Sequence, residues 1–250
     1  MISKLTFYDF LGYIVPGSIL LLILVYWAES VVEFDLITVG SISGTGETVL
    51  FLVVAYLAGH LIQVAGRRFE LSEKGKWGGY FSVQFLRPDS SYYSAEFRER
   101  LLGRVHETFD IAPLQDEGDE KARDGRLQEI FNLCYTLVVQ RGISQHADIH
   151  NAIFGMFRGV IVLWLFAIAL FTIAVLRHSA VTVASVLDYN ETPIDEVKWH
   201  LVVTGLAAFA AVATLGSLRD RFRHFGQRFV DAVYRSFYVD VTTRRPAGRP

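Results

Sequence analysis

Four polar side chains lie in or beside strongly apolar stretches of the sequence and are the candidates for a functional site. They are Asp9, His60, Gln63 and Arg158. An ionisable group inside an apolar segment is costly, so it is usually paired or faces water. The sequence therefore predicts an intramembrane polar cluster in which Asp9 neutralises Arg158 and the other two side chains supply hydrogen bonds. Alternatively, Arg158 extends to the surface and His60 bonds a neighbouring carbonyl.

Other residues whose side chains could bind a metal or react do not form a complete motif. His146 and His150 have the i, i+4 spacing that can hold a metal ion on a helix, and a third ligand would have to come from Asp148 or His106. No Glu directly follows the first of these histidines, so we interpret them as ordinary polar residues. Cys134 falls on an apolar helical face, which is typical of a buried residue. We predict no catalytic residue, no metal and no cofactor.

The composition indicates a membrane protein. Of 250 residues, 52% are hydrophobic and 20% are charged, and the mean hydropathy is +0.32. This is more apolar surface than a soluble domain needs. A single cysteine excludes an internal disulfide. Basic and acidic residues are balanced in the 67–150 segment, so no nucleic-acid partner is expected.

Four apolar segments are long enough to cross a bilayer, whose hydrocarbon core of about 30 Å needs roughly 20 helical residues. They are 10–28, 48–66, 159–176 and 201–218. Pro16 and Gly17 predict a kink near the start of the first segment. The fourth segment is rich in small residues, which either lets a neighbouring helix approach closely or simply reflects a helix of small apolar residues. These small residues are Gly205, Ala208, Ala211 and Gly216.

The positions of the arginines predict the orientation of the four spans. The connection 29–47 has no Lys or Arg, and the connection after the third span has only Arg177 and Lys198, so both are expected to face outward. Basic residues instead follow the second and fourth spans directly. Because cytoplasmic loops carry the excess of Lys and Arg, both termini and the 67–150 insert are expected in the cytoplasm. The basic residues expected at the membrane surface are Arg67, Arg68, Arg219, Arg221, Arg223 and Arg228.

The 67–150 insert is predicted to be mainly helical. Apolar residues recur with helical spacing over 97–109 and 127–138, and the charged stretch 115–126 between them is predicted to be a solvated loop. The stretch 75–86 is interpreted as a turn followed by a short extended piece. A further helix is expected to begin near Ser144 and to continue without a break into the third span.

The 219–250 tail is predicted to contain a basic amphipathic helix. Its apolar residues share one face and its arginines another; the apolar residues are Phe222, Phe225, Phe229, Val233 and Phe237. We favour a position at the inner membrane surface, with the apolar face in the headgroup region. Packing against the insert is the alternative, because amphipathicity does not identify the partner. The last residues, 244–250, are predicted to be disordered.

Together these patterns predict an all-α integral membrane protein with four transmembrane helices, a mainly helical cytoplasmic insert between the second and third, and an amphipathic C-terminal helix. The expected division is 1–66 for transmembrane helices 1 and 2, 67–150 for the insert, 151–218 for transmembrane helices 3 and 4, and 219–250 for the tail.

Two motifs carry a resemblance to known proteins. The stretch FYDFLGYIVPG at 7–17 and the stretch YLAGHLIQ at 56–63 resemble small bacterial inner-membrane proteins of unassigned function, some of which are found in phage-defence loci. The resemblance implies a multi-pass protein of the bacterial inner membrane and a link to phage defence. It implies no catalytic residues.

The function predicted from these features is that of a non-enzymatic membrane effector or channel-like homo-oligomer. The lipid bilayer is its expected environment, and a cytoplasmic protein or a small-molecule signal would act on the insert. A membrane-anchored scaffold or accessory subunit that recruits cytoplasmic partners is the alternative. A third hypothesis is a lipid-active enzyme that uses His60 and Asp9, although two polar residues make an incomplete catalytic group.

Overall fold

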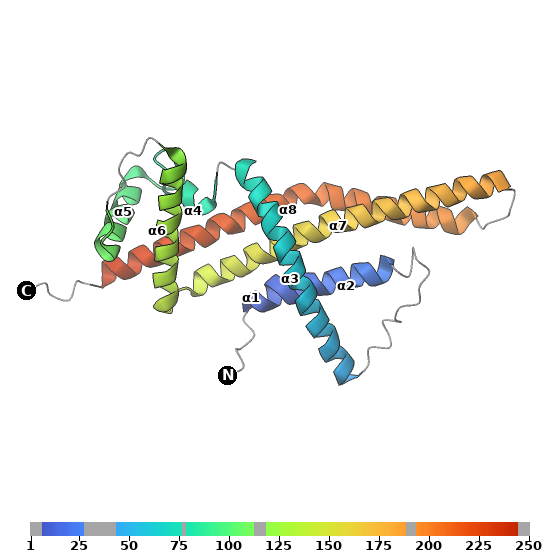
Figure 1. The fold of residues 1–250 in the computed structure, drawn as a ribbon, viewed down its shortest axis with the longest axis horizontal. Helices are drawn as coiled ribbons and strands as arrows, with labels where there is room; N and C mark the ends of the chain where they lie inside the picture. Colours follow the sequence, from blue (N-terminus) through green and yellow to red (C-terminus); the bar gives the residue numbers. More distant parts are fainter. Residues whose placement is uncertain (1–6, 28–43, 77–78, 113–118, 189–193, 245–250) are drawn as a thin grey trace, which may run out of the picture. The chain divides into compact units, whose positions relative to one another are not determined.

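The computed structural model describes residues 7–27, 44–76, 79–112, 119–188 and 194–244 (Figure 1). Within these ranges, the described side chains exclude those of residues 7, 26, 73–76, 174–175, 178–188, 194–204, 207–208 and 211. The described part of the chain is helical and contains no strand, which confirms the all-α prediction there. Its elements are α1 (Phe7–Asp9), the π-helical η1 (Phe10–Ile14), α2 (Val15–Trp27), α3 (Thr45–Lys76), α4 (Phe81–Gln84), α5 (Ala95–Phe109), α6 (Glu120–Gln140), α7 (Gln145–Asp188) and α8 (Ile194–Thr243).

The chain divides into two compact units. The first unit comprises Met1–Phe69 and Gly155–Phe222, and the second comprises Glu70–Phe154 and Arg223–Pro250. These boundaries lie a few residues after the predicted ones at 66, 150 and 218. The helices α3, α7 and α8 each contribute residues to both units. The predicted helix near Ser144 is confirmed, because α7 continues without interruption from Gln145.

Two helices in the described part of the chain are long and apolar enough to cross a membrane. They are Thr45–Ser72, which contains the predicted second span, and Gln145–Ile173, which contains residues 159–173 of the predicted third span. The predicted first span corresponds to a shorter apolar helix, Phe10–Val25. The predicted fourth span, 201–218, lies within α8, where several side chains are outside the described set. The described residues therefore support two membrane-crossing helices, and the other two spans stay a prediction.

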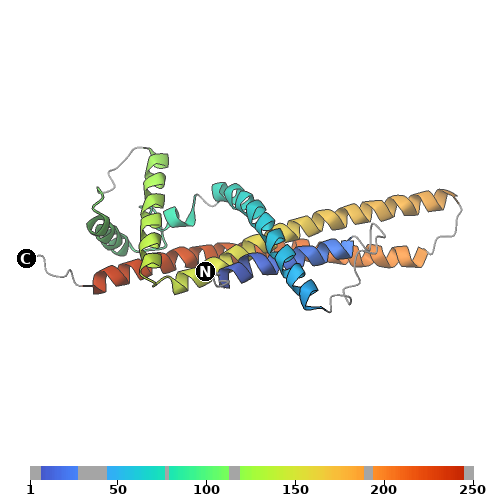
Figure 2. The same cartoon turned by 60° about the horizontal axis from the view of Figure 1, so that its bottom comes forward.

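Inside the first unit, α3 crosses both α2 and α7 (Figures 1 and 2). Glycines bring the backbones together at this crossing. A Cβ atom at Gly17 would overlap the carbonyl oxygen of Ala55, and one at Gly59 would overlap the carbonyl oxygen of Tyr13. Small residues allow this close approach, which is how helices associate where lipid removes the hydrophobic drive. The π-helical turn η1 lies just before Pro16, where a kink is predicted; π-helical turns and prolines both interrupt regular α-helical bonding.

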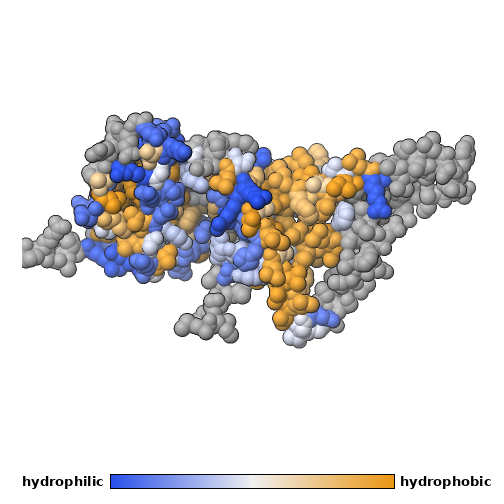
Figure 3. All heavy atoms as spheres, viewed as in Figure 1, coloured by the Kyte–Doolittle hydropathy of each residue, from blue (hydrophilic) through white to orange (hydrophobic). Residues whose placement is uncertain are grey.

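The outer face of α3 is apolar and uncovered. Leu50, Leu57, Leu61 and Val64 recur at helical spacing on this face, and Leu61 is 72% exposed. Figure 3 shows apolar side chains gathered over this part of the first unit. A continuous apolar face of this kind is unfavourable in water, and hydrocarbon solvates it without cost.

The core of the second unit is built around the C-terminal part of α8. Val230, Val233, Tyr234 and Phe237 are buried there. The ring of Phe237 stacks on Phe109 of α5 with centroids 5.8 Å apart. In addition, Phe131 of α6 meets Tyr234 edge to face at 5.6 Å.

The favoured prediction that this apolar face lies in lipid headgroups is therefore wrong, and the alternative of packing against the insert is correct. The hydrophobic effect demands that such a face be buried but does not select what buries it.

Two local predictions within the insert also need correction. The predicted loop 115–126 contains the first turns of α6, which begins at Glu120. Asp119 caps this helix by accepting a 2.9 Å hydrogen bond from the Lys121 amide.

The predicted extended piece before Leu86 contains the helical turn α4. Apolar residues alternate there with Ser82 and Gln84, which imitates a strand pattern. In fact all of 81–86 is buried, and Ser82 donates to Gln128 at 2.5 Å. Residues 77–78 and 115–118 of these two predictions lie outside the described residues.

Several further predictions also fall outside the described residues. They concern most of the outer connection 29–47, residues 189–193 of the connection after the third span, and the disordered C-terminal end at 245–250.

Candidate functional site

The centre of the candidate site is a buried hydrogen-bonded pair in the first unit. Gln63 of α3 is 5% exposed and Arg158 of α7 is 8% exposed. The Arg158 guanidinium donates from Nε and Nη2 to Gln63 Oε1 at 3.0 and 2.7 Å. A hydrogen bond in which one partner is charged is about twice as strong as a neutral one. The structure thus brings together two of the four predicted cluster residues.

The amide nitrogen of the same glutamine binds two backbone carbonyls on different helices. Gln63 Nε2 donates to the Gly12 carbonyl oxygen at 2.6 Å and to the Gly155 carbonyl oxygen at 2.9 Å. In a regular helix the Gly12 carbonyl would accept from the amide of residue 16, but Pro16 has no N–H. The π-helical turn at Phe10–Ile14 ends two residues before that proline. The glutamine therefore satisfies a carbonyl that the local sequence leaves without its usual donor.

Glycines make room for this polar group. A Cβ atom at Gly66 would lie 2.7 Å from Cγ of Arg158. One at Gly159 would lie 3.3 Å from Gln63 Nε2 and 3.2 Å from the Pro16 ring. Any larger side chain at these two positions would displace the arginine or the glutamine. The three helices η1–α2, α3 and α7 meet here, and we call the group of Gly12, Gln63, Gly155 and Arg158 the glutamine clasp.

The other two predicted cluster residues lie differently. His60 is exposed and stacks on Tyr13 at 4.0 Å between ring centroids, with Tyr56 edge-on at 4.7 Å. Its ring makes no hydrogen bond within the described part of the chain, so the structure places it in an aromatic group and outside the clasp. Asp9 is half-buried at the end of α1. Its pairing with Arg158 stays a prediction.

The predicted membrane-surface arginines are found on helix surfaces. Arg67, Arg68, Arg221, Arg223 and Arg228 are exposed. The remaining one, Arg219, lies over the ring of Phe69 at 5.9 Å from the centroid, an arrangement in which the aromatic face attracts the cation. Their contact with lipid stays a prediction.

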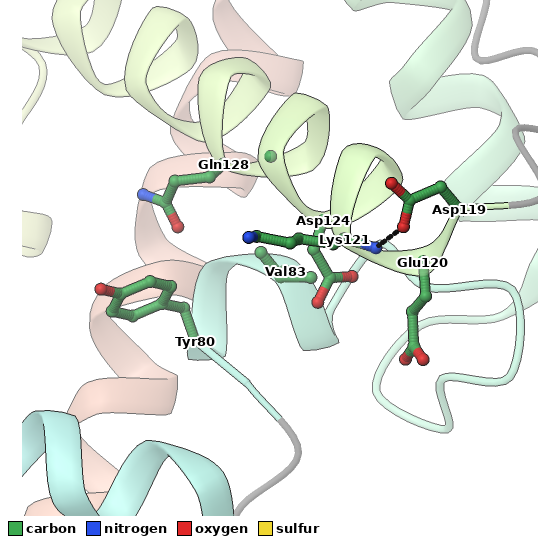
Figure 4. Close-up of a pocket in the computed structure, with 8 residues that line it drawn as sticks. Tyr80, Val83, Asp119, Glu120, Lys121, Asp124 and Gln128 are labelled. Carbon is green, nitrogen blue, oxygen red and sulfur yellow. Dashed lines mark hydrogen bonds between the residues drawn. The ribbon is translucent and has the colours of Figure 1, made fainter.

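The second unit contains an open pocket of about 650 Å³ between α4 and the start of α6 (Figure 4). Its acidic residues are already engaged. Arg87 binds Asp124 through Nη2 at 2.5 Å and through Nε at 3.2 Å, and lies 3.4 Å from Glu120. Asp119 caps α6. The carboxylates of the pocket therefore stabilise the insert, and little of their negative charge is left to bind a ligand. In Figure 4, the Lys121 side chain extends from α6 toward Gln128 and Tyr80.

The weak metal candidates are not assembled into a metal site. No three His, Cys, Asp or Glu side chains are grouped to hold a metal ion within the residues that the structure describes. Asp148 accepts a 2.7 Å hydrogen bond from Ser144 at the start of α7.

Sequence reasoning missed the two backbone members of the clasp. The signal for the first was present, because a proline in an apolar helix leaves the carbonyl four residues earlier without a donor and calls for a polar side chain nearby. Nothing in the sequence indicates the Gly155 carbonyl, which depends on how the helices cross. No protein-family model, curated protein or solved structure matches the chain. The geometry of the clasp is therefore the basis for the proposed function.

Proposed function

We propose that the chain is a four-span protein of the bacterial inner membrane that acts as a non-enzymatic effector, with the glutamine clasp holding its helices in a closed arrangement. The observation that supports this proposal is the burial of an arginine and a glutamine at the meeting of three apolar helices. Buried polar groups inside apolar bundles are costly, and they commonly mark ion paths or conformational switches. The suggested role in phage defence is supported by the sequence resemblance alone.

The environment of the first unit fits a bilayer. Its helix α3 exposes an apolar face, while the polar groups at its centre bind one another. In hydrocarbon, every backbone carbonyl without a helical donor must find a partner inside the protein. The Gly12 carbonyl does so through Gln63. The arginines that follow the second and fourth spans favour an orientation with both termini, the insert and the tail in the cytoplasm.

Transmission from the insert to the spans would use continuous helices. The arginine of the clasp lies on α7, the same helix that begins at Gln145 in the second unit. Within the first unit, Trp164 of α7 donates from Nε1 to Thr214 of α8 at 2.6 Å. A signal that changes packing in the second unit would therefore act on two linked helices. Breaking the clasp would expose Arg158 and open a polar path, at a cost set by its charge-assisted bonds.

The chemistry of the clasp argues against an enzyme. Its hydrogen-bonded members are an amide, a guanidinium and two carbonyls, and none of these is a nucleophile or a general base at neutral pH. The exposed His60 stacks on Tyr13. A lipid-active enzyme would need an additional orienting group for this histidine.

A homo-oligomer is part of the proposal. Within the described part of the chain, a Cβ atom at Gly205 or at Gly216 of α8 would meet no atom within 4 Å. Close approach of a neighbouring helix, one of the two alternatives for this small-residue segment, is thus not seen at these two glycines within the described residues. A second copy of the chain would fill that space in a bundle with a shared path.

The decisive experiment is ion efflux from liposomes that contain the purified full-length protein. Replacing Gln63 by Leu should weaken the clasp and raise efflux above the wild-type level. The matched control Gln145→Leu changes an exposed glutamine at the start of α7 and should leave efflux unchanged. If neither the wild type nor the Gln63 variant conducts, the scaffold or accessory-subunit hypothesis replaces the effector.

A further inference from the structure

A second surface feature of the second unit lies where α8 faces the segment that joins α4 to α5. It is a depression of about 270 Å³. One wall consists of the stacked rings of Phe85 and Tyr92, whose centroids are 4.4 Å apart with an angle of 6° between the ring planes. The other wall is a face of α8 that carries His224, Arg228 and Arg235. All of its lining residues belong to the second unit.

The charges in this depression do not cancel. Asp231 is already engaged, because its Oδ1 accepts from the Tyr93 hydroxyl at 2.8 Å and from Arg235 Nε at 2.7 Å. The positive charge of Arg235 is therefore balanced by that carboxylate. Arg228 is exposed and makes no ion pair or hydrogen bond within the described residues. One turn earlier on the same face, His224 adds a ring N–H donor. The depression thus carries a net positive charge.

The opposite wall presents an oriented hydroxyl. Gln227 Nε2 donates to the Tyr92 hydroxyl oxygen at 2.5 Å. Because that oxygen acts as an acceptor there, the hydroxyl hydrogen remains available to donate to a ligand. The parallel stacking on Phe85 holds the tyrosine ring in place. Donors therefore converge from both walls on a space large enough for a small charged group.

We propose that this depression binds a phosphate-bearing ligand. The planar guanidinium of Arg228 matches the geometry of phosphate oxygens, and Tyr92 and His224 supply further donors. The phosphate could belong to a lipid headgroup or to a soluble compound, and the chemistry of recognition is shared. This inference goes beyond the proposed effector function, since the site would bind phosphate whether or not the protein conducts ions.

The test uses the full-length protein in nanodiscs of phosphatidylcholine. Binding of inorganic pyrophosphate is measured by calorimetry for the wild type, for Arg228→Gln and for the control Arg100→Gln. Arg100 is also exposed but lies on α5, where it pairs with Glu96 at 2.5 Å. Both variants remove one positive charge, so they weaken non-specific attraction equally. A second arm adds phosphatidic acid to the nanodiscs and counts by native mass spectrometry the lipid that remains bound.

We expect Arg228→Gln to weaken binding about tenfold, the loss typical of one charge-assisted hydrogen bond, and Arg100→Gln to leave it unchanged. Tyr92→Phe keeps the stacked ring and should give a smaller loss. An effect seen with pyrophosphate assigns the site to a soluble ligand, and one seen only with phosphatidic acid assigns it to a headgroup. Absence of saturable binding in both arms, or equal weakening by the two arginine variants, overturns the proposal. Efflux measured on the same protein reports separately on the effector function.

Discussion

The side-chain amide of Gln63 donates a 2.6 Å hydrogen bond to the carbonyl of Gly12, the carbonyl that Pro16 cannot serve. The other end of the same amide accepts two hydrogen bonds from Arg158. One residue thus binds a backbone carbonyl next to a proline and also binds a buried charged group. Both tasks require an uncharged side chain that donates and accepts, and the glutamine amide does both.

Gln63→Leu should therefore destabilise the first unit. The change leaves the guanidinium without the glutamine oxygen and two carbonyls without their side-chain donor. We expect the free energy of unfolding to fall by about 3 kcal/mol, as for the loss of a buried hydrogen bond to a charged group. Unfolding by a denaturing detergent in mixed micelles measures the change. Gln145→Leu, at an exposed position, serves as the control; an equal loss in both variants would contradict the role of the clasp.

Two glycines, Gly59 at the helix crossing and Gly103 on α5, are expected to respond in opposite ways to the same Gly→Ala substitution. Gly59→Ala should lower stability by about 2 kcal/mol, because its Cβ would overlap the Tyr13 backbone and neither helix can give way. Gly103→Ala on α5 should instead raise stability by about 0.5–1 kcal/mol, since a Cβ there meets nothing within 4 Å and alanine favours the helix. Thermal unfolding of both variants checks the prediction. A stabilising Gly59→Ala would show that the helices are not in backbone contact.

The helices could be predicted from the sequence better than their contacts. The length of the apolar segments predicted the second and third spans, and the helical spacing of apolar residues predicted α5 and most of α6. The early start of α6 was missed because Gly125 and its charged neighbours resemble a loop, although Asp119 is a good helix cap. The partner of the α8 tail could not be predicted, since a buried face looks the same whether lipid or protein covers it. The clasp depends on which helices cross, and only Pro16 gave a local hint.

The single cysteine of the chain provides a probe of the second unit. Cys134 is fully buried, and burial raises the pKa of its thiol. Because the thiolate is the reactive form, maleimide should modify the native protein very slowly and the unfolded protein rapidly. The rate of modification across a denaturant series should follow unfolding of the insert. Gln140→Cys at the exposed end of α6 is the control and should react at once. Rapid modification of Cys134 in the native protein would contradict its place in the core.

Alkaline pH should destabilise the second unit through its buried tyrosines. Burial, with Asp231 nearby, raises the pKa of Tyr93, and burial also raises that of Tyr234. The unfolded phenols ionise near pH 10, whereas the folded ones stay protonated. The stabilisation is therefore complete below about pH 10 and is lost as the pH rises further. Tyr93→Phe should flatten this loss, and Tyr238→Phe is the control. Stability that does not change between about pH 9 and pH 11 would contradict the prediction.

The membrane arrangement itself is tested most directly by cysteine accessibility in intact bacteria. In a Cys134→Ala background, single cysteines replace Thr38 and Asn190 in the two predicted outer connections, and Gln140 and Thr243 in the insert and the tail. We predict that a membrane-impermeant maleimide labels the first pair in intact cells and the second pair only after permeabilisation. Labelling at position 140 or 243 in intact cells, or recovery of the chain without detergent, would contradict a four-span bundle with its insert inside.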